Sequence, residues 1–423
     1  MSILELFSIM VTTAALFGWI SRRWLRLPLT IGTMLLTVIA SLVLVAVSSI
    51  HPGLKAWAGL LLGAIHFEDL ILHGMLSVLL FAGAFLLDIK ALFEERLAIA
   101  LMAVVGTVAS TLATAALLAG ALSLLGMDVS WIDCLLFGAL ISPTDPIAVL
   151  EMLKRVGAPR YIQAQLAGES LFNDGVGAVI FLALLEASRG TAPTPGHFLM
   201  LLTIEAGGGL LLGVALAWLS SLLLRGTIAY QIELLLTLSL ATGGYALAEQ
   251  WHVSAPLEAV AAGIALRYFS RKHPKLVSSN RIDHFWEVVD EVMNVILFVL
   301  VGFEVLAIPF SRLPLEAGAI AVVAVTAVRF TVVSVLVSLL RAFGKGFRSS
   351  IRILSWGGLR GGLSLALALS IPHRPARTWI LVATYSVVLV SIVVQGSTME
   401  WVLKRLLKEE TPKISDEEIQ GTS

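Results

Sequence analysis

Apolar residues fill this chain in long runs that are separated by short polar segments. Runs of about 20 residues recur between residues 4 and 403, and a helix of that length crosses a hydrocarbon core of roughly 30 Å. The pattern therefore predicts an all-α, polytopic membrane protein with about thirteen transmembrane helices. We place these spans at 4–21, 29–49, 67–88, 97–125, 131–152, 163–187, 197–224, 231–249, 253–269, 285–308, 314–340, 350–371 and 377–403.

Two of the predicted spans contain residues that ordinary helices avoid. In the fifth span Pro143 and Pro146 flank Thr144 and Asp145, and each proline removes one backbone N–H and displaces the carbonyl four residues earlier. In the twelfth span two glycine pairs surround Arg360. We expect both helices to be broken, because interrupted helices in the two halves of a chain mark the midplane site of a transporter. The carbonyls freed by the prolines are candidate cation ligands.

The sixth span carries two carboxylates, a hydroxyl and an amide in the run Gly-Glu-Ser-Leu-Phe-Asn-Asp-Gly at 168–175. An ionisable side chain at the bilayer centre is costly, so it usually faces a cavity, an ion or a partner. Ser170, Asn173 and Asp174 lie three or four residues apart and share one side of a helix. Since hard cations are held by several oxygens, this run predicts a cation site.

The charged residues predict how the chain is oriented. Most of the 29 Lys and Arg residues fall in alternate loops, for example Arg22, Arg23, Lys154 and Arg155. Because such residues collect on the cytoplasmic side, we expect the N-terminus outside, the C-terminus in the cytoplasm, and an odd number of spans in the plasma (inner) membrane.

The composition excludes several classes of protein. With 58% hydrophobic and 14% charged residues, the chain is too apolar for a soluble domain. The net charge of zero gives no reason to expect a nucleic-acid partner. The single cysteine, Cys134, rules out an internal disulfide. The histidines show no zinc-like spacing, and we expect no cofactor.

Four motifs in combination support a family resemblance. Ser-Pro-Thr-Asp-Pro at 142–146, the run at 168–175, Arg329 in the eleventh span and Gly-Gly-Leu-Arg-Gly-Gly around Arg360 resemble the NhaP-type sodium/proton antiporters and the related eukaryotic exchangers. The resemblance covers essentially all the spans. It implies a homodimer with inverted repeats and two crossed, broken helices, in which a mobile core domain moves against a scaffold that forms the dimer contact. The implied divisions are scaffold at 1–90 and 191–308, core at 91–190 and 309–408, and a cytoplasmic tail at 409–423.

The resemblance also implies which residues bind the transported cation or proton. Asp174 matches the aspartate that binds the cation directly, while Ser170, Thr144 and Asp145 match positions that supply side-chain, backbone or water-mediated ligands. Asn173 completes this group. Competition of a proton with one monovalent cation at Asp174 is then the expected mechanism, because burial disfavours a charged carboxylate. Asn173 cannot titrate, so we expect an electroneutral one-for-one exchange where Asp-Asp relatives exchange two protons.

Three further positions receive different roles. Glu169 matches an acid that forms a structural ion pair with an arginine of the eleventh helix, here Arg329, since an unpaired buried charge is poorly tolerated. Arg360 is expected to balance the negative ends of the broken-helix dipoles. One position departs from the pattern: many relatives carry a glutamate in the third span where this chain has Ala82. Cation selectivity therefore does not transfer with the resemblance.

Other functions remain as alternatives. The nearest is potassium/proton exchange. A cation channel would also use acids within the membrane, but it would need a continuous pore and would conduct without proton coupling. An intramembrane hydrolase would need a nucleophile and a base, for which Ser170 and Asp174 are the only candidates. We therefore expect a transporter and not an enzyme, with sodium and protons as substrates, lithium or potassium as rival cations, and membrane lipid as a partner.

Overall fold

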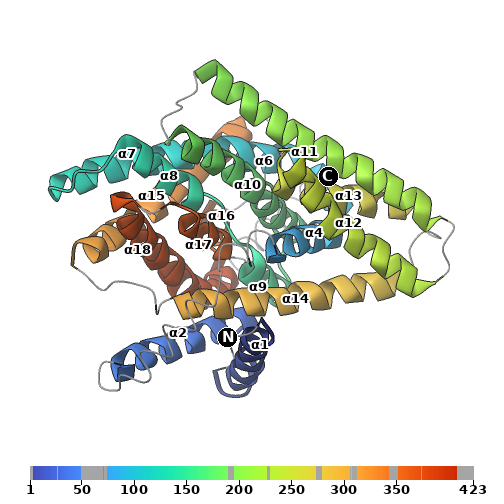
Figure 1. Cartoon of the computed structure of the whole chain (residues 1–423), viewed down its shortest axis with the longest axis horizontal. Helices are drawn as coiled ribbons and strands as arrows, with labels where there is room; N and C mark the ends of the chain where they lie inside the picture. The colour runs from blue at the N-terminus through green and yellow to red at the C-terminus, as the bar shows by residue number, and fades with distance from the viewer. Residues whose placement is uncertain are drawn as a thin grey trace, which may run out of the picture.

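The computed structural model describes residues 3–25, 27–48, 70, 74–188, 195–225, 229–272, 279–304, 306, 312–342, 351–372 and 374–406, and every regular element in these ranges is a helix (Figure 1). In chain order the elements are α1 (Ile3–Ile20), η1 (Ser21–Leu25), α2 (Leu29–Ser48), α4 (Leu76–Leu86), α5 (Ile89–Glu94), α6 (Arg96–Ala100), η3 (Leu101–Gly106), α7 (Thr107–Leu124), α8 (Trp131–Ile141), α9 (Ile147–Val156), α10 (Arg160–Ala187), α11 (Pro195–Leu224), α12 (Tyr230–Gln250), α13 (Ala255–Lys272), α14 (Ser279–Glu304), α15 (Arg312–Ala342), α16 (Ile351–Trp356), α17 (Gly362–Leu369), α18 (Pro375–Val390) and η5 (Ser391–Gly396).

The helices confirm the all-α, polytopic membrane architecture. Within the described ranges, 7 helices are long and apolar enough to cross a membrane. Every predicted span overlaps a described helix or a pair of short ones, but the count of thirteen crossings stays a prediction. Some predicted positions lie outside the described residues, namely 49, 67–69, 71–73, 305, 307–308, 350 and the tail at 409–423.

The fifth and twelfth predicted spans are both broken. Helix α8 ends at Ile141 and α9 begins at Ile147, so the two prolines occupy the break. Helix α16 ends at Trp356 and α17 begins at Gly362. In the gaps the Asp145 N–H donates to the Leu359 carbonyl at 2.8 Å, which pairs the two extended segments as an isolated antiparallel bridge. The two broken helices therefore meet at their breaks.

Most of the helix packing falls into two groups, which α10 connects through its contacts with α11 and α13. Helices from 1–90 pack on helices from 191–304, as α2 and α4 do on α14 and α4 on α13. Helices from 91–190 pack on helices from 312–406, as α7 does on α15 and α8 on α18. The long helix α14 lies between the pair α1 and α2 and the rest of the bundle (Figure 1). The scaffold and core roles of these two groups stay predictions.

Small residues allow the closest helix contacts. A methyl group at Gly213 of α11 would lie 2.9 Å from the Ala261 side chain of α13. One at Gly263 of α13 would lie 2.7 Å from Ala84 of α4. Such approaches give van der Waals packing where lipid supplies no hydrophobic driving force. They hold α13 between α11 and α4.

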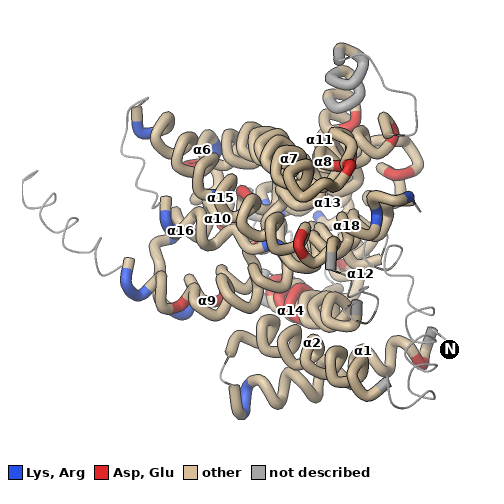
Figure 2. Tube along the Cα trace, turned by 90° about the vertical axis from the view of Figure 1, so that its left-hand side faces the viewer, with Lys and Arg blue, Asp and Glu red and all other residues tan. Residues whose placement is uncertain are grey.

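Charge is unevenly placed along the bundle. In Figure 2 most Lys and Arg positions lie along the left-hand edge, which includes the region of α9 and α16. Arg22 and Arg23 of η1, Lys154 and Arg155 of α9 and Arg341 of α15 all stand in the last turns of their elements. The Lys and Arg residues that the sequence concentrates in alternate loops thus lie together at one end of the folded bundle, which we call the basic end.

Candidate ion-binding site

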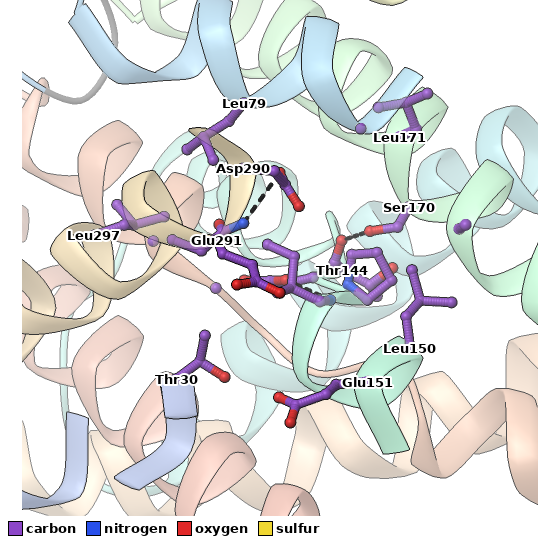
Figure 3. Close-up of a pocket in the computed structure, with 18 of the residues that line it drawn as sticks. Thr30, Leu79, Thr144, Leu150, Glu151, Ser170, Leu171, Asp290, Glu291 and Leu297 are labelled. Carbon is purple, nitrogen blue, oxygen red and sulfur yellow. Dashed lines mark hydrogen bonds between the residues drawn. The ribbon is translucent and has the colours of Figure 1, made fainter. Parts of the chain in front are cut away.

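A cavity of about 520 Å³ lies at the crossing of the broken helices (Figure 3), and its lining also includes Arg22, Lys154 and Arg155 of the basic end of the bundle. Its inner part is lined by the Thr144–Pro146 break, by Ser170 and Asp174 of α10, and by Gly361 and Gly362 before α17. Its outer part includes Lys154 and Arg155, whose side chains are exposed. The cavity therefore connects the most polar part of α10 with the surface.

Asp174 reaches this cavity because α10 is held tightly on both sides of it. A methyl group at Gly177 would overlap the ring of Pro143, and one at Gly175 would overlap the side chain of Leu257 of α13. Asp174 is half-buried. It lies close enough to Asp145 for the two charges to repel each other. Two carboxylates that share a cavity attract a cation or a proton.

Three side chains tie the Thr144 segment to α10. The Asn173 amide donates to Thr144 Oγ1 at 3.0 Å, and Asn173 Oδ1 accepts from the Thr144 N–H at 3.2 Å. The Ser170 hydroxyl donates to the Thr144 carbonyl (Figure 3). Ser170 and Asn173 are each 1% exposed. A break in a helix leaves backbone groups without partners, and these contacts satisfy them in a buried place.

Asp145 both caps a helix and lines the cavity. Its backbone N–H makes the bridge to Leu359, and its Oδ1 accepts from the N–H of Ile147 at 3.0 Å, so it caps the first turn of α9. The same side chain lines the cavity. A methyl group at Gly361 would overlap the Asp145 carboxyl group, so the glycine lets the two broken segments approach.

The structure places Glu169 against Arg329, as the sequence predicts. Arg329 Nη1 donates to Glu169 Oε1, while Nη2 donates to the Leu354 carbonyl at 2.9 Å. Glu169 is 1% and Arg329 8% exposed. The pair joins α10, α15 and α16 away from the cavity, because neither residue lines it. The pair is buried and lies outside the lining of the cavity, and its structural role stays a prediction.

Arg360 binds the end of α8 and changes one expectation. Its Nη1 donates to the carbonyls of Ser142 and Pro143, the second at 2.8 Å. Its backbone N–H donates to Ser391 Oγ at 3.0 Å. The carbonyl that Pro146 frees at Ser142 is therefore taken by a guanidinium, so it is not a free cation ligand as the sequence suggested. A cation at the negative end of a helix is favourable, and here the protein supplies it.

The structure also reveals buried or cavity-lining polar residues that the sequence analysis does not single out. Asp290 and Asn294 of α14 line the same cavity as Asp174, with Asn294 0% exposed. Their spacing of four residues on an apolar helix is the signal that could have found them. Glu258 of α13 is 0% exposed, and both its carboxyl oxygens lack partners. Ala82 is buried and does not line the cavity.

Comparison with known proteins decides the family. The family model described as "Sodium/hydrogen exchanger, transmembrane" matches residues 11–405. The chain belongs to the sodium/hydrogen exchanger family. Among exchanger relatives, it is 40% identical to the Na⁺/H⁺ antiporter NhaP of Pseudomonas aeruginosa over 410 residues, which is 95% of this chain and 97% of that one. It is 32% identical to the Na⁺/H⁺ antiporter NhaH of Halobacillus aidingensis, over 80% of this chain and 84% of that one.

A solved exchanger structure has the same fold. The sodium proton antiporter MjNhaP1 from Methanocaldococcus jannaschii superimposes with a TM-score of 0.72 at 18% identity, over 96% of this chain and 98% of that one. At this identity the match speaks for the fold alone. Together these comparisons confirm the resemblance to NhaP-type antiporters that the four motifs indicated.

Proposed function

We propose that this chain is a secondary active transporter that exchanges sodium for protons. The observation that carries the proposal is the position of Asp174, a half-buried carboxylate on the cavity at the crossing of two broken helices, beside Asp145, Thr144 and Ser170. Hard monovalent cations are bound by oxygens of these kinds. The named Na⁺/H⁺ antiporters among its relatives support the choice of sodium and protons as substrates.

The mechanism is competition at Asp174. A negative carboxylate in a cavity of low polarity is unfavourable alone, so it carries either a proton or a cation. Each form neutralises the site and permits the core helices to move. The hydroxyls of Ser170 and Thr144 and the carboxyl of Asp145 complete the oxygen set around the cation. Alternating access then exposes Asp174 first to one side of the membrane and then to the other.

The stoichiometry is one cation for one proton. Asn173, which precedes Asp174, is committed at both ends of its amide to Thr144, at 3.0 and 3.2 Å. The Asn173 side chain therefore holds the segment around Thr144 in place and contains no group that titrates. An exchange of equal charges is electroneutral, so the membrane potential gives it no direct drive.

The cavity faces the cytoplasm, and the protein resides in the plasma (inner) membrane as a homodimer. Lys154 and Arg155 at the outer part of the cavity belong to the basic end of the bundle, and basic residues favour the cytoplasmic side. With this orientation the N-terminus is outside and the C-terminus is in the cytoplasm. Helices from 1–90 and 191–308 form the scaffold and the dimer contact, and those from 91–190 and 309–408 form the moving core.

The test is proton flux in everted membrane vesicles with a pH-sensitive dye, challenged in turn with sodium, lithium and potassium. We expect dequenching with sodium, and a response to potassium alone would favour potassium/proton exchange. Asp174→Asn should abolish the response, because the amide cannot titrate. The purified variant should keep its melting temperature, because the amide has nearly the shape of the carboxyl group. Cation-driven proton flux by reconstituted Asp174→Asn protein would disprove the role of Asp174.

A further inference from the structure

The cavity has a second group of oxygens on the wall opposite the broken helices. This wall belongs to α14, where Asp290 and Asn294 both line the cavity, and Figure 3 shows Asp290 there. The Asn294 amide donates to Asp290 Oδ1 at 3.1 Å, which directs the carboxyl and the amide to one place. Asn294 is 0% exposed, and its Oδ1 has no hydrogen-bond partner. A buried carbonyl oxygen without a donor costs free energy unless something positive meets it.

The protein itself does not neutralise this group. In the part of the chain that the structure describes, no Lys or Arg nitrogen lies within 4.0 Å of the Asp290 carboxylate. The charged residues Asp145, Glu291 and Lys154 line the same cavity as Asp290. Two of these three are negative. Thr30 of α2 adds another buried hydroxyl without a partner to the same cavity.

We propose that Asp290 and the side-chain carbonyl of Asn294, together with Asp145 on the opposite wall, form a second binding site for the monovalent cation. The site lies between the surface and Asp174, and it loads the transport site from the cytoplasmic side. The proposal rests on the proposed exchange function. Its ligands are all oxygens, which suits sodium or lithium, and water completes the coordination.

The location of this second site separates its effect from that of Asp174. Asp290 belongs to α14, whereas Asp174 belongs to α10, and these helices lie in the two different packing groups. A cation held by α14 does not move with α10, so the second site changes how readily the cation is captured and not the step in which α10 moves. Loss of Asp290 should therefore raise the KM for the cation and leave the maximal rate nearly unchanged.

The first experiment measures sodium-driven proton flux in proteoliposomes that contain Asp290→Asn. We expect the KM for sodium to rise about tenfold, the loss typical of one charged ligand, with the maximal rate within about twofold of the wild type. Asp290→Glu should restore most of the affinity because it restores the charge. Asp290→Ser provides the same test if the asparagine variant does not purify as a folded protein.

Glu291→Gln is the matched control. It removes one negative charge from the neighbouring residue of the same helix, and Glu291 also lines the cavity, but its side chain is exposed and makes no bond to Asn294. A charge that only attracts cations from a distance is screened by salt, with a Debye length of about 3 Å at 1 M. With choline chloride at high concentration, the KM defect of Glu291→Gln should vanish and that of Asp290→Asn should remain.

A binding measurement removes the dependence on transport. In detergent, sodium should still raise the melting temperature of Asp174→Asn protein, and this shift should disappear in the double variant Asp174→Asn/Asp290→Asn. If wild-type protein exchanges sodium while Asp290→Asn behaves like Glu291→Gln at every salt concentration, the second site does not exist and the proposed function stands. If wild-type protein shows no cation-driven proton flux, the proposed function itself fails.

Discussion

The buried pair of Glu169 and Arg329 gives the sharpest prediction about stability. Glu169→Gln keeps the shape of the side chain and removes its charge, which leaves the guanidinium of Arg329 without a counter-charge beside its bond to the Leu354 carbonyl at 2.9 Å. Arg329 is 8% exposed, so water cannot replace the lost partner, and a guanidinium does not neutralise itself by releasing a proton. Breaking such a pair on one side costs about 3–5 kcal/mol.

That free energy can be converted into a shift in melting temperature. An unfolding entropy of about 2.1 cal/mol/K per residue gives about 0.9 kcal/mol/K for 423 residues. Glu169→Gln should therefore melt about 3–6 °C below the wild type. Arg329→Ala should fall at least as far, because it also loses the bond to Leu354 and the packing of the side chain.

The assay is thermal unfolding of purified protein in detergent at one fixed heating rate, since membrane proteins often unfold irreversibly. The exposed pair of Glu400 and Lys404, joined at 2.6 Å on one helix, provides the control. Glu400→Gln should change the melting temperature by less than about 1 °C, because surface pairs contribute little. The double variant Glu169→Gln/Arg329→Ala should lose less than the sum of the single losses. Additive losses, or single variants that melt like Glu400→Gln, would refute the reasoning.

Three further predictions concern neighbouring features. Gly358→Ala should lower the melting temperature, because its methyl group would lie 2.6 Å from Arg329 Nε, whereas Gly120→Ala, with open space around it, should not. Glu258→Met should leave the melting temperature unchanged or raise it, since it replaces a buried carboxyl whose two oxygens lack partners with an apolar side chain of similar volume; a clear loss would reveal an important role for this acid. Finally, an exchange that moves one net charge through 100 mV would gain or lose about 2.3 kcal/mol, whereas an electroneutral exchange is unaffected by voltage. In proteoliposomes with a fixed sodium gradient, the internal pH at zero net flux should therefore not depend on a voltage set by potassium and valinomycin. The control is to show first that potassium is not a substrate. A shift of that null point with voltage would show unequal charge exchange.

Local sequence already determined the membrane fold and most of the candidate site. Apolar runs of helical length admit no other structure in a bilayer, because every backbone group there must be bonded internally. The prolines at 143 and 146 and the glycines around Arg360 broke two helices where the sequence indicated, since these residues act on the backbone within one turn. The spacing of Ser170, Asn173 and Asp174 on α10 likewise follows from the helix alone.

Tertiary structure decided which of these groups face an ion and which face the protein. The Ser142 carbonyl, which Pro146 frees, became an acceptor for Arg360, the Thr144 carbonyl became an acceptor for Ser170, and the Asn173 amide became bonded to Thr144. Contacts of this kind join residues that are 26 to 218 positions apart, as Thr144 and Ser170 and as Ser142 and Arg360 are. No periodicity within one helix encodes them, because they depend on how separate helices pack. The placement of Asp290 and Asn294 opposite Asp145 has the same origin: their own helix predicts only their common face, and the cavity beside that face exists only after α14 has packed against α17 and the crossing of the broken helices.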